Sequence, residues 1–175
     1  MHIFSRYFPL PSRLAGALLL SAATLCPAAE TPQALLQQLW ALSSHGPNQA
    51  VNLSALGELF HEDAVVFGGG YRGDAPRVSR SSKAEFLKQM APLSAKGFYE
   101  CEIERQVLLH ERFATVYSVV ETRSTLTQAK PDFVGANSLQ LFKTEQGWKI
   151  LSLYYFVGKR EAPVTSKGES GVCLR

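Results

Sequence analysis

Several features that mark common functional classes are missing from this sequence. Only three cysteines and four histidines occur in 175 residues, and no two of them have the short spacing of a zinc site. No Gly-Lys-Ser/Thr follows a glycine run, and no Gly-x-Ser-x-Gly turn is present. The sequence therefore predicts no metal, no cofactor and no phosphate-binding loop.

Basic runs and long apolar runs are also absent. Lys and Arg number 18 against 15 Asp and Glu, but two of the arginines lie in the first 29 residues, which contain no acid. Without that segment, 16 bases face 15 acids and the domain is nearly neutral. Neither nucleic acid nor an anionic membrane surface is expected as a partner.

The first 29 residues follow the three-part pattern of a secretory signal peptide. Arg6 and Arg13 precede an apolar run over residues 14–25, which is too short to span a membrane. Small residues follow, and we expect cleavage after Ala28 or Ala29. Export to the periplasm or secretion is predicted, with no membrane attachment after cleavage. A domain over residues 30–160 and a tail over residues 161–175 remain.

Helical periodicity and capping signals predict three helices. Thr31-Pro32 starts the first, and leucines recur at helical spacing up to Leu42. A second helix is expected over residues 54–61. Ser82 and Glu85 form a capping-box pattern that predicts a third over residues 83–91.

The remaining pattern is β-rich. A short strand should end at the three glycines 68–70, and an irregular stretch should follow. Four antiparallel strands are expected over residues 98–109, 113–126, 137–143 and 148–156. The turn at residues 144–147 predicts a central hairpin, and the apolar run after it predicts a strand covered on both faces. The order predicts an α+β domain with helices on one face of a curved sheet.

This order, with the stretches at residues 59–67 and 147–152, resembles the nuclear transport factor 2-like superfamily and, within it, the exported bacterial SnoaL-like branch. The resemblance covers residues 31–157. It implies a cone-shaped, cystatin-like fold, a curved and mainly antiparallel sheet with three helices on its concave side, and a pocket between them. Members include isomerases, hydrolases, cyclases and binding proteins, so the fold does not choose a function.

The ketosteroid isomerase members of that superfamily provide a residue-by-residue comparison. Their catalytic aspartate falls on Gly68, and their proton-donating aspartate falls on Leu139 or Gln140. The tyrosine of their first helix falls near Leu39 or Trp40. None of these residues supplies the required acid or phenol, so the resemblance does not carry the isomerase mechanism to this chain.

Glu121 and Arg123 are the candidates for a polar site because they are two residues apart on one predicted strand and share a face. On the concave face they would form a buried pair, with Glu121 as an acid or base. On the convex face they would be an ordinary surface pair. Strand periodicity leaves both alternatives open.

Other polar and aromatic residues complete the predicted ligand-binding set. Asn137 and Gln140 have opposite parity, as do Tyr154 and Tyr155, so at most one of each pair can face the pocket. The candidate ligand-binding residues are Trp40, Tyr71, Arg123, Asn137, Gln140 and Tyr155. His61, Glu62 and Asp63 are expected not to converge, because they are consecutive.

Cys101 and Cys173 are a candidate disulfide, because an exported chain reaches an oxidising compartment. The alternative is a buried free Cys101 with a mobile tail. Apolar residues at both parities, including Val116, Val119 and Val120, predict an apolar outer face and a homodimer.

Three function hypotheses remain, and the third depends on one condition. The first is a periplasmic domain that binds a small, largely apolar molecule in its pocket. The second is an interaction or inhibitor protein of the periplasm. An isomerase or hydrolase remains possible only if Glu121 or another acid is buried in the pocket, so the sequence does not decide whether the protein is an enzyme.

Overall fold

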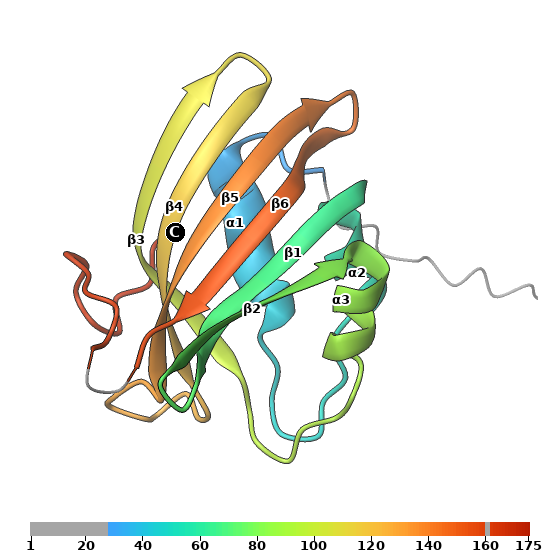
Figure 1. The fold of residues 1–175 in the computed structure, drawn as a ribbon. Helices are drawn as coiled ribbons and strands as arrows, with labels where there is room; N and C mark the ends of the chain where they lie inside the picture. Colours follow the sequence, from blue (N-terminus) through green and yellow to red (C-terminus); the bar gives the residue numbers. More distant parts are fainter. Residues whose placement is uncertain (1–27, 160–161) are drawn as a thin grey trace, which may run out of the picture.

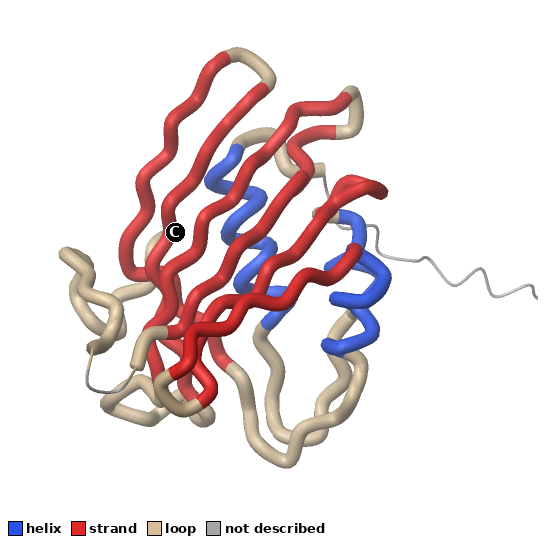
Figure 2. The backbone as a smooth tube through the Cα atoms, in the orientation of Figure 1, coloured by secondary structure: helices blue, strands red, loops and turns tan. Residues whose placement is uncertain are grey.

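A computed structural model describes residues 28–159 and 162–175 of the chain. Three helices pack against one side of a curved six-stranded sheet (Figures 1 and 2). The predicted α+β class and the three helices on the concave side are confirmed. The predicted signal peptide, up to residue 27, lies outside the described residues.

The first and third helices begin where their capping residues predict. The three helices are α1 (Pro32–Ser43), α2 (Leu53–Glu58) and α3 (Lys83–Met90). The Thr31 hydroxyl accepts a hydrogen bond from the backbone N–H of Ala34, and Ser82 forms a reciprocal capping box with Glu85. The second helix was predicted to reach residue 61, but it ends at Glu58 because the chain turns there into the first strand. None of the described helices is long and apolar enough to cross a membrane.

Six strands form one sheet in the order β2-β1-β6-β5-β4-β3. Their bounds are β1 (Phe60–Arg72), β2 (Ala75–Ser82), β3 (Tyr99–His110), β4 (Phe113–Arg123), β5 (Phe133–Thr144) and β6 (Gly147–Val157). Only the pairing of β1 with β6 is parallel. The predicted meander is therefore confirmed as β3 to β6, and β6 is central.

Three expectations about the sheet are wrong. The glycines 68–70 do not end a strand, because β1 continues through them and turns at Gly73, whose φ is +59°. The stretch after them, predicted to be irregular, contains strand β2. The strand over 148–156 is not covered on both faces either, because Tyr154 projects from the convex face and is 40% exposed.

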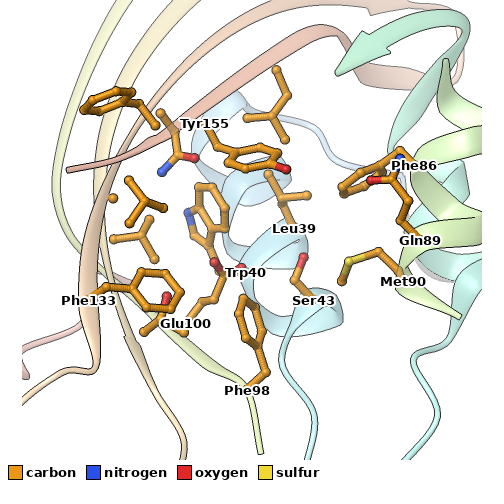
Figure 3. Close-up of a pocket in the computed structure, with 17 residues that line it drawn as sticks. Leu39, Trp40, Ser43, Phe86, Gln89, Met90, Phe98, Glu100, Phe133 and Tyr155 are labelled. Carbon is orange, nitrogen blue, oxygen red and sulfur yellow. The ribbon is translucent and has the colours of Figure 1, made fainter. Parts of the chain in front are cut away.

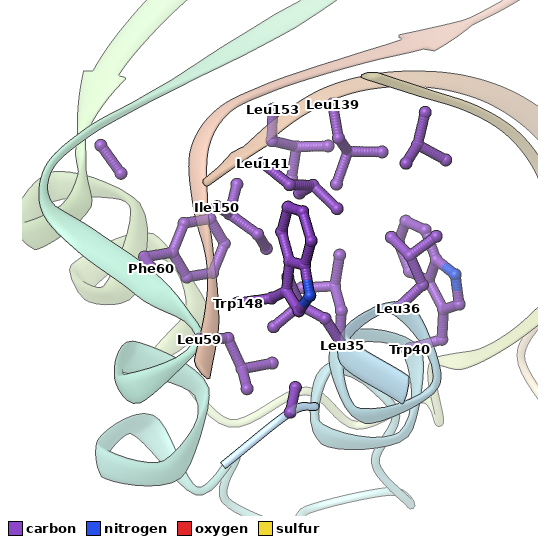
Figure 4. Packing of buried hydrophobic residues seen from close by; sticks show 14 of the residues in the cluster. Leu35, Leu36, Trp40, Leu59, Phe60, Leu139, Leu141, Trp148, Ile150 and Leu153 are labelled. Carbon is purple, nitrogen blue, oxygen red and sulfur yellow. The ribbon is translucent and has the colours of Figure 1, made fainter. Parts of the chain in front are cut away.

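The main core lies between α1 and the concave face of the sheet. Leu35, Leu36 and Leu39 of α1 are at most 1% exposed, and they belong to the same buried cluster as Trp148 and Ile150 of β6 (Figure 4). Each fully buried leucine stabilises the fold by roughly 1.5–3 kcal/mol relative to an exposed one. This packing holds α1 against the wide middle of the sheet and leaves space near its C-terminal end.

The C-terminal tail lies on the opposite, convex face, where the C-terminus appears in Figure 1. A disulfide joins Cys101 of β3 to Cys173, with their Cα atoms 5.0 Å apart. Val164 packs against Ile103 and Val119, which form a second, small core with Cys101. The tail is therefore an ordered cover over part of the outer face.

The three valines behind the dimer prediction are all buried within one copy of the chain. Val116 and Val120 belong to the main core on the concave side, and Val119 lies under the tail. The expectation that they form an exposed outer face is therefore wrong, and the structure, which contains one copy, does not test dimerisation.

Candidate functional site

A cavity of about 280 Å³ lies between α1, α3 and the concave face of the sheet (Figure 3). Its wall is mainly apolar and rich in aromatic rings. The aromatic residues are Trp40, Phe86, Phe98, Phe133, Tyr155 and Phe156. The polar residues are Ser43, Gln89, Glu100, Thr122, Asn137 and Tyr155. Concave, mostly apolar pockets with a few polar groups are the usual form of small-molecule sites.

Strand pairing explains how the polar residues come to one cavity. Glu100 on β3 is paired with Thr122 on β4, and Asn137 on β5 is paired with Tyr155 on β6. Directly paired residues project from the same face of a sheet. Because successive side chains of a strand project from opposite faces, Glu121 and Arg123 project from the convex face.

Glu100 is the acid of this cavity. Its backbone N–H donates a hydrogen bond to the Ser44 hydroxyl at 2.9 Å. The residue is half-buried and accessible from the cavity, and its burial among the apolar walls raises its pKa to about 8. No ion pair or hydrogen bond joins this carboxyl to another residue within 28–159 and 162–175. Glu100 can therefore exist in both protonation states near neutral pH.

Tyr155 reaches into the cavity because the strand beside it has no side chain at residue 68. A Cβ atom on Gly68 would stand 2.5 Å from the Tyr155 hydroxyl oxygen. Gly68, the position that aligns with the catalytic aspartate of the ketosteroid isomerases, is thus covered by the phenol of Tyr155. No described residue forms a hydrogen bond with this hydroxyl.

Asn137 and Trp40 form further parts of the wall. Asn137 is only 7% exposed, and its side-chain amide has no hydrogen-bond partner among the described residues. The Trp40 Nε1 atom is buried and also has no hydrogen-bond partner in that part of the chain. Because this atom is inaccessible, Trp40 faces the cavity through ring carbons rather than through its N–H group.

The structure brings together three of the predicted ligand-binding residues and separates the others. Trp40, Asn137 and Tyr155 line the cavity. Gln140 lies on the convex face, where its Oε1 atom accepts a hydrogen bond from Ser152 at 3.3 Å. Tyr71 is 44% exposed and packs edge-on against Phe156, outside the cavity lining. Gln140 and Tyr71 therefore lie outside the cavity that they were expected to line.

Glu121 and Arg123 form a buried pair, as the first alternative required, but on the convex face. Arg123 donates a hydrogen bond to Glu121 at 2.8 Å, and the Ser170 hydroxyl and the backbone N–H of Gly171 also donate to that carboxylate. Burial opposes ionisation of Glu121, but these hydrogen bonds outweigh it and hold its pKa below the usual value. The pair anchors the tail, so the assignment of Glu121 and Arg123 to the pocket is corrected.

His61, Glu62 and Asp63 lie at the start of β1, outside the cavity lining. Their potential ligand atoms all lie within 4.8 Å of one another, so the expectation that they do not converge is wrong. The bulge in β1 between Phe60 and Val65 brings them together. Glu62 and Asp63 are exposed, and exposed acidic groups of this kind are common without a metal.

Sequence reasoning missed Glu100, although one signal pointed to it. A disulfide from Cys101 to the tail places the Cys101 side chain on the face that the tail covers. Its strand neighbour Glu100 must then face the other way, and Glu121, which pairs with Cys101, must share the tail's face. The disulfide therefore indicates that Glu100 faces the cavity side of the sheet and that Glu121 faces the tail.

Solved structures with the same fold are known. A nuclear transport factor 2-like protein with a cystatin-like fold from Novosphingobium aromaticivorans is 17% identical, with 74% of this chain and 82% of that chain covered and a TM-score of 0.57. A protein of unknown function with a cystatin-like fold from Nostoc punctiforme is 13% identical, with coverages of 78% and 99% and a TM-score of 0.55. No family model and no curated protein matches the sequence. These similarities show the fold alone.

Proposed function

We propose that this chain, which has the nuclear transport factor 2-like fold, binds a small, largely apolar molecule in the cavity. The observation that carries the proposal is the set of polar groups left without protein partners. Glu100, Asn137 and Tyr155 converge on an apolar cavity, and none of their side-chain polar groups is paired with another described residue. These groups are open to the cavity and free to pair with a ligand, and a few convergent polar groups of this kind fix a ligand's orientation in an apolar pocket.

The volume bounds the ligand. About 280 Å³ lies at the lower end of the range for small-molecule pockets. Aromatic and aliphatic walls favour an apolar body, and the few polar residues favour one polar group on it. The SnoaL-like branch, export and a periplasmic location belong to this proposal and rest on the sequence.

Mass spectrometry of protein purified from the native periplasm under non-denaturing conditions tests this proposal. We expect a bound organic molecule that is released on unfolding. Met90→Trp fills the cavity from α3 and should abolish retention of that molecule. Lys88→Trp changes an exposed residue on the same helix and is the matched control. Equal retention by both variants would place the ligand elsewhere.

The pKa of Glu100 favours a second candidate, in which the cavity transfers a proton on its ligand. An acid or base works best when its pKa lies near the working pH, and Glu100 meets this condition where Glu121 does not. Exchange of α-protons of small ketones in D2O, followed by NMR, tests this activity. Proton exchange by the wild type that is lost in Glu100→Gln supports this second candidate. Equal proton exchange by the wild type and the variant refutes it.

Partly exposed aromatic rings on the convex face favour the interaction hypothesis as an alternative. Tyr117 and Tyr154 are 39% and 40% exposed and lie in one row across the sheet, both paired with Ser138. A homodimer through this row would bury both rings. Sedimentation of the wild type and of a Tyr117→Ser, Tyr154→Ser double variant tests it. A monomeric wild type at tens of micromolar contradicts this alternative.

A further inference from the structure

The carboxyl group of Glu100 has no counter-ion. No Lys, Arg or His is among the residues that line the cavity. The carboxyl also forms no ion pair within the described ranges. An ionised carboxylate in such surroundings is unfavourable unless a positive charge is supplied. The cavity thus contains one acid, which is negative when ionised, and has no positive group of its own.

Aromatic rings line the same cavity as this acid. Six rings from α1, α3, the segment before β3, β5 and β6 line the same cavity, and Trp40, Phe98 and Phe133 lie near Glu100 in the close-up (Figure 3). The face of an aromatic ring carries partial negative charge and attracts cations, most strongly for tryptophan. Trp40 suits this role because its N–H group is buried away from the cavity surface.

We propose that the ligand of this cavity is an organic cation, in which an ammonium group is attached to an apolar body. This inference rests on the proposed function and specifies the chemical class of its ligand. The ammonium group supplies the counter-ion that Glu100 lacks, and the ring faces attract the same charge. An anionic ligand would meet an acid and no cation, while a neutral ligand would leave the ionised form of Glu100 without a counter-ion.

A cationic ligand, a neutral ligand that accepts a hydrogen bond and a purely apolar ligand would each bind with a different dependence of affinity on pH. A cation binds the ionised form of Glu100, so its affinity rises with pH through the pKa of about 8. A neutral hydrogen-bond acceptor binds the protonated form, so its affinity falls over the same range. A purely apolar ligand pairs with neither form, and it gains nothing as Glu100 ionises.

Few other titratable groups face this carboxyl. Tyr155 of β6 is the one other titratable side chain in the cavity lining; α1, α3, β4 and β5 contribute uncharged residues there. A neighbouring hollow that Glu100 also borders contains Tyr99 and Arg123, and Arg123 is paired with Glu121. His45 stacks on Phe98 but lines a different hollow. Between pH 6 and 9, Glu100 therefore dominates the charge of the cavity.

The test uses two probes of equal shape and different charge, phenyltrimethylammonium and tert-butylbenzene. The first is a permanent cation, so its own charge does not change with pH. Affinity is measured by calorimetry or by tryptophan fluorescence at pH 6 and pH 9, with the fold checked by circular dichroism. We expect the affinity for phenyltrimethylammonium to rise by roughly two orders of magnitude, from the ionised fraction of a group with a pKa of about 8. We expect the affinity for tert-butylbenzene not to rise.

Two variants make the assignment to Glu100 specific. Glu100→Gln should remove the rise with pH and bind the cation no better than the wild type does at pH 6. Glu145→Gln, which changes an exposed acid paired with Arg112, should behave as the wild type. Binding of tert-butylbenzene to Glu100→Gln would show that the cavity of this variant is intact. If the variant does not fold, the dependence of wild-type affinity on pH still tests the inference.

The remaining outcomes separate the two proposals. Tighter binding of tert-butylbenzene than of the cation at both pH values overturns the inference and leaves the proposed pocket standing. Cation binding that is independent of pH, or unchanged in Glu100→Gln, also overturns it. Failure of both probes to bind at millimolar concentration counts against the pocket itself.

Discussion

The Tyr155 hydroxyl oxygen lies over Gly68, 2.5 Å from the place that a Cβ atom would occupy there. The Tyr155 Cζ atom is 2.7 Å from the same point, so the phenol can occupy this position only because residue 68 has no side chain. Real Cβ atoms do not approach other heavy atoms this closely. A glycine that looks like the end of a strand in the sequence therefore makes room for Tyr155, a residue of the cavity wall.

The first prediction follows from this contact. Gly68→Ala should displace Tyr155 and reduce stability by about 1–3 kcal/mol, the usual cost of overpacking. Gly70→Ala, two residues along the same strand, should cost much less, because its Cβ would meet nothing closer than 3.8 Å. Urea unfolding of both variants measures the difference.

A double-mutant cycle assigns the cost to Tyr155. In a Tyr155→Leu background, Gly68→Ala should lose most of its effect, since the phenol is gone. An equal loss of stability in both backgrounds would mean that the added methyl group clashes with something other than Tyr155.

The second prediction concerns the pH dependence of stability. The unfolded chain releases the Glu100 proton near pH 4.5, whereas the folded chain holds it until about pH 8. Between these values the folded state binds more protons, so the free energy of unfolding falls as the pH rises, by up to about 5 kcal/mol. Glu100→Gln does not titrate and should be more stable than the wild type at pH 9.

Denaturant unfolding at intervals from pH 4.5 to 9 measures both curves. Glu145→Gln serves as the control, because this exposed acid contributes to a surface ion pair. Parallel curves for wild type and Glu100→Gln would show that Glu100 titrates normally in the folded state.

Much of the fold could be predicted because its signals are local. The cap at Thr31, the capping box at Ser82 and the Gly-containing turn before Trp148 each depend on a few neighbouring residues, and each lies where the sequence placed it. Strand β2 gave no such signal. It pairs only with β1 at the edge of the sheet, and its first six side chains are exposed, so no apolar alternation marks it.

The candidate site was harder to predict because it depends on the direction in which strands face. Period-two alternation correctly separates Asn137 from Gln140 and Tyr155 from Tyr154, but it does not say which member faces inward. The choice is made by contacts distant in sequence: α1 covers one face and the tail covers the other. Glu121 therefore belongs to the tail and Glu100 to the cavity.

The third prediction concerns the tail. Cys173→Ser removes the disulfide to Cys101 and should reduce stability by about 2–4 kcal/mol, because the unfolded chain regains the freedom of a long loop. The hydrogen bonds from Ser170 and Gly171 to Glu121 should weaken with it, since the tail is no longer held in place. Limited proteolysis should then cleave the tail much faster than in the wild type.

The mass of the unreduced protein checks the bridge directly. It should be lower than that of the reduced protein by two hydrogens, with no thiol available for alkylation. Two free thiols after rapid alkylation would contradict the bridge. Ser166→Ala removes one hydrogen bond from the tail to Glu104 and leaves the disulfide intact, so it provides the mild control in the proteolysis assay.

The last prediction places the mature N-terminus at Ala29. Ala29 is 4% exposed within the main core, and its carbonyl oxygen accepts a hydrogen bond from the backbone N–H of Trp148 at 2.9 Å. Cleavage after Ala28 keeps both contacts, whereas cleavage after Ala29 removes them. A chain that starts at Ala29 should therefore be more stable than one that starts at Glu30, by about 1–2 kcal/mol. N-terminal sequencing of the exported protein should read Ala-Glu-Thr. A first residue of Glu30 with undiminished stability would contradict the role of Ala29, and a cytoplasmic protein that keeps Met1 would contradict export.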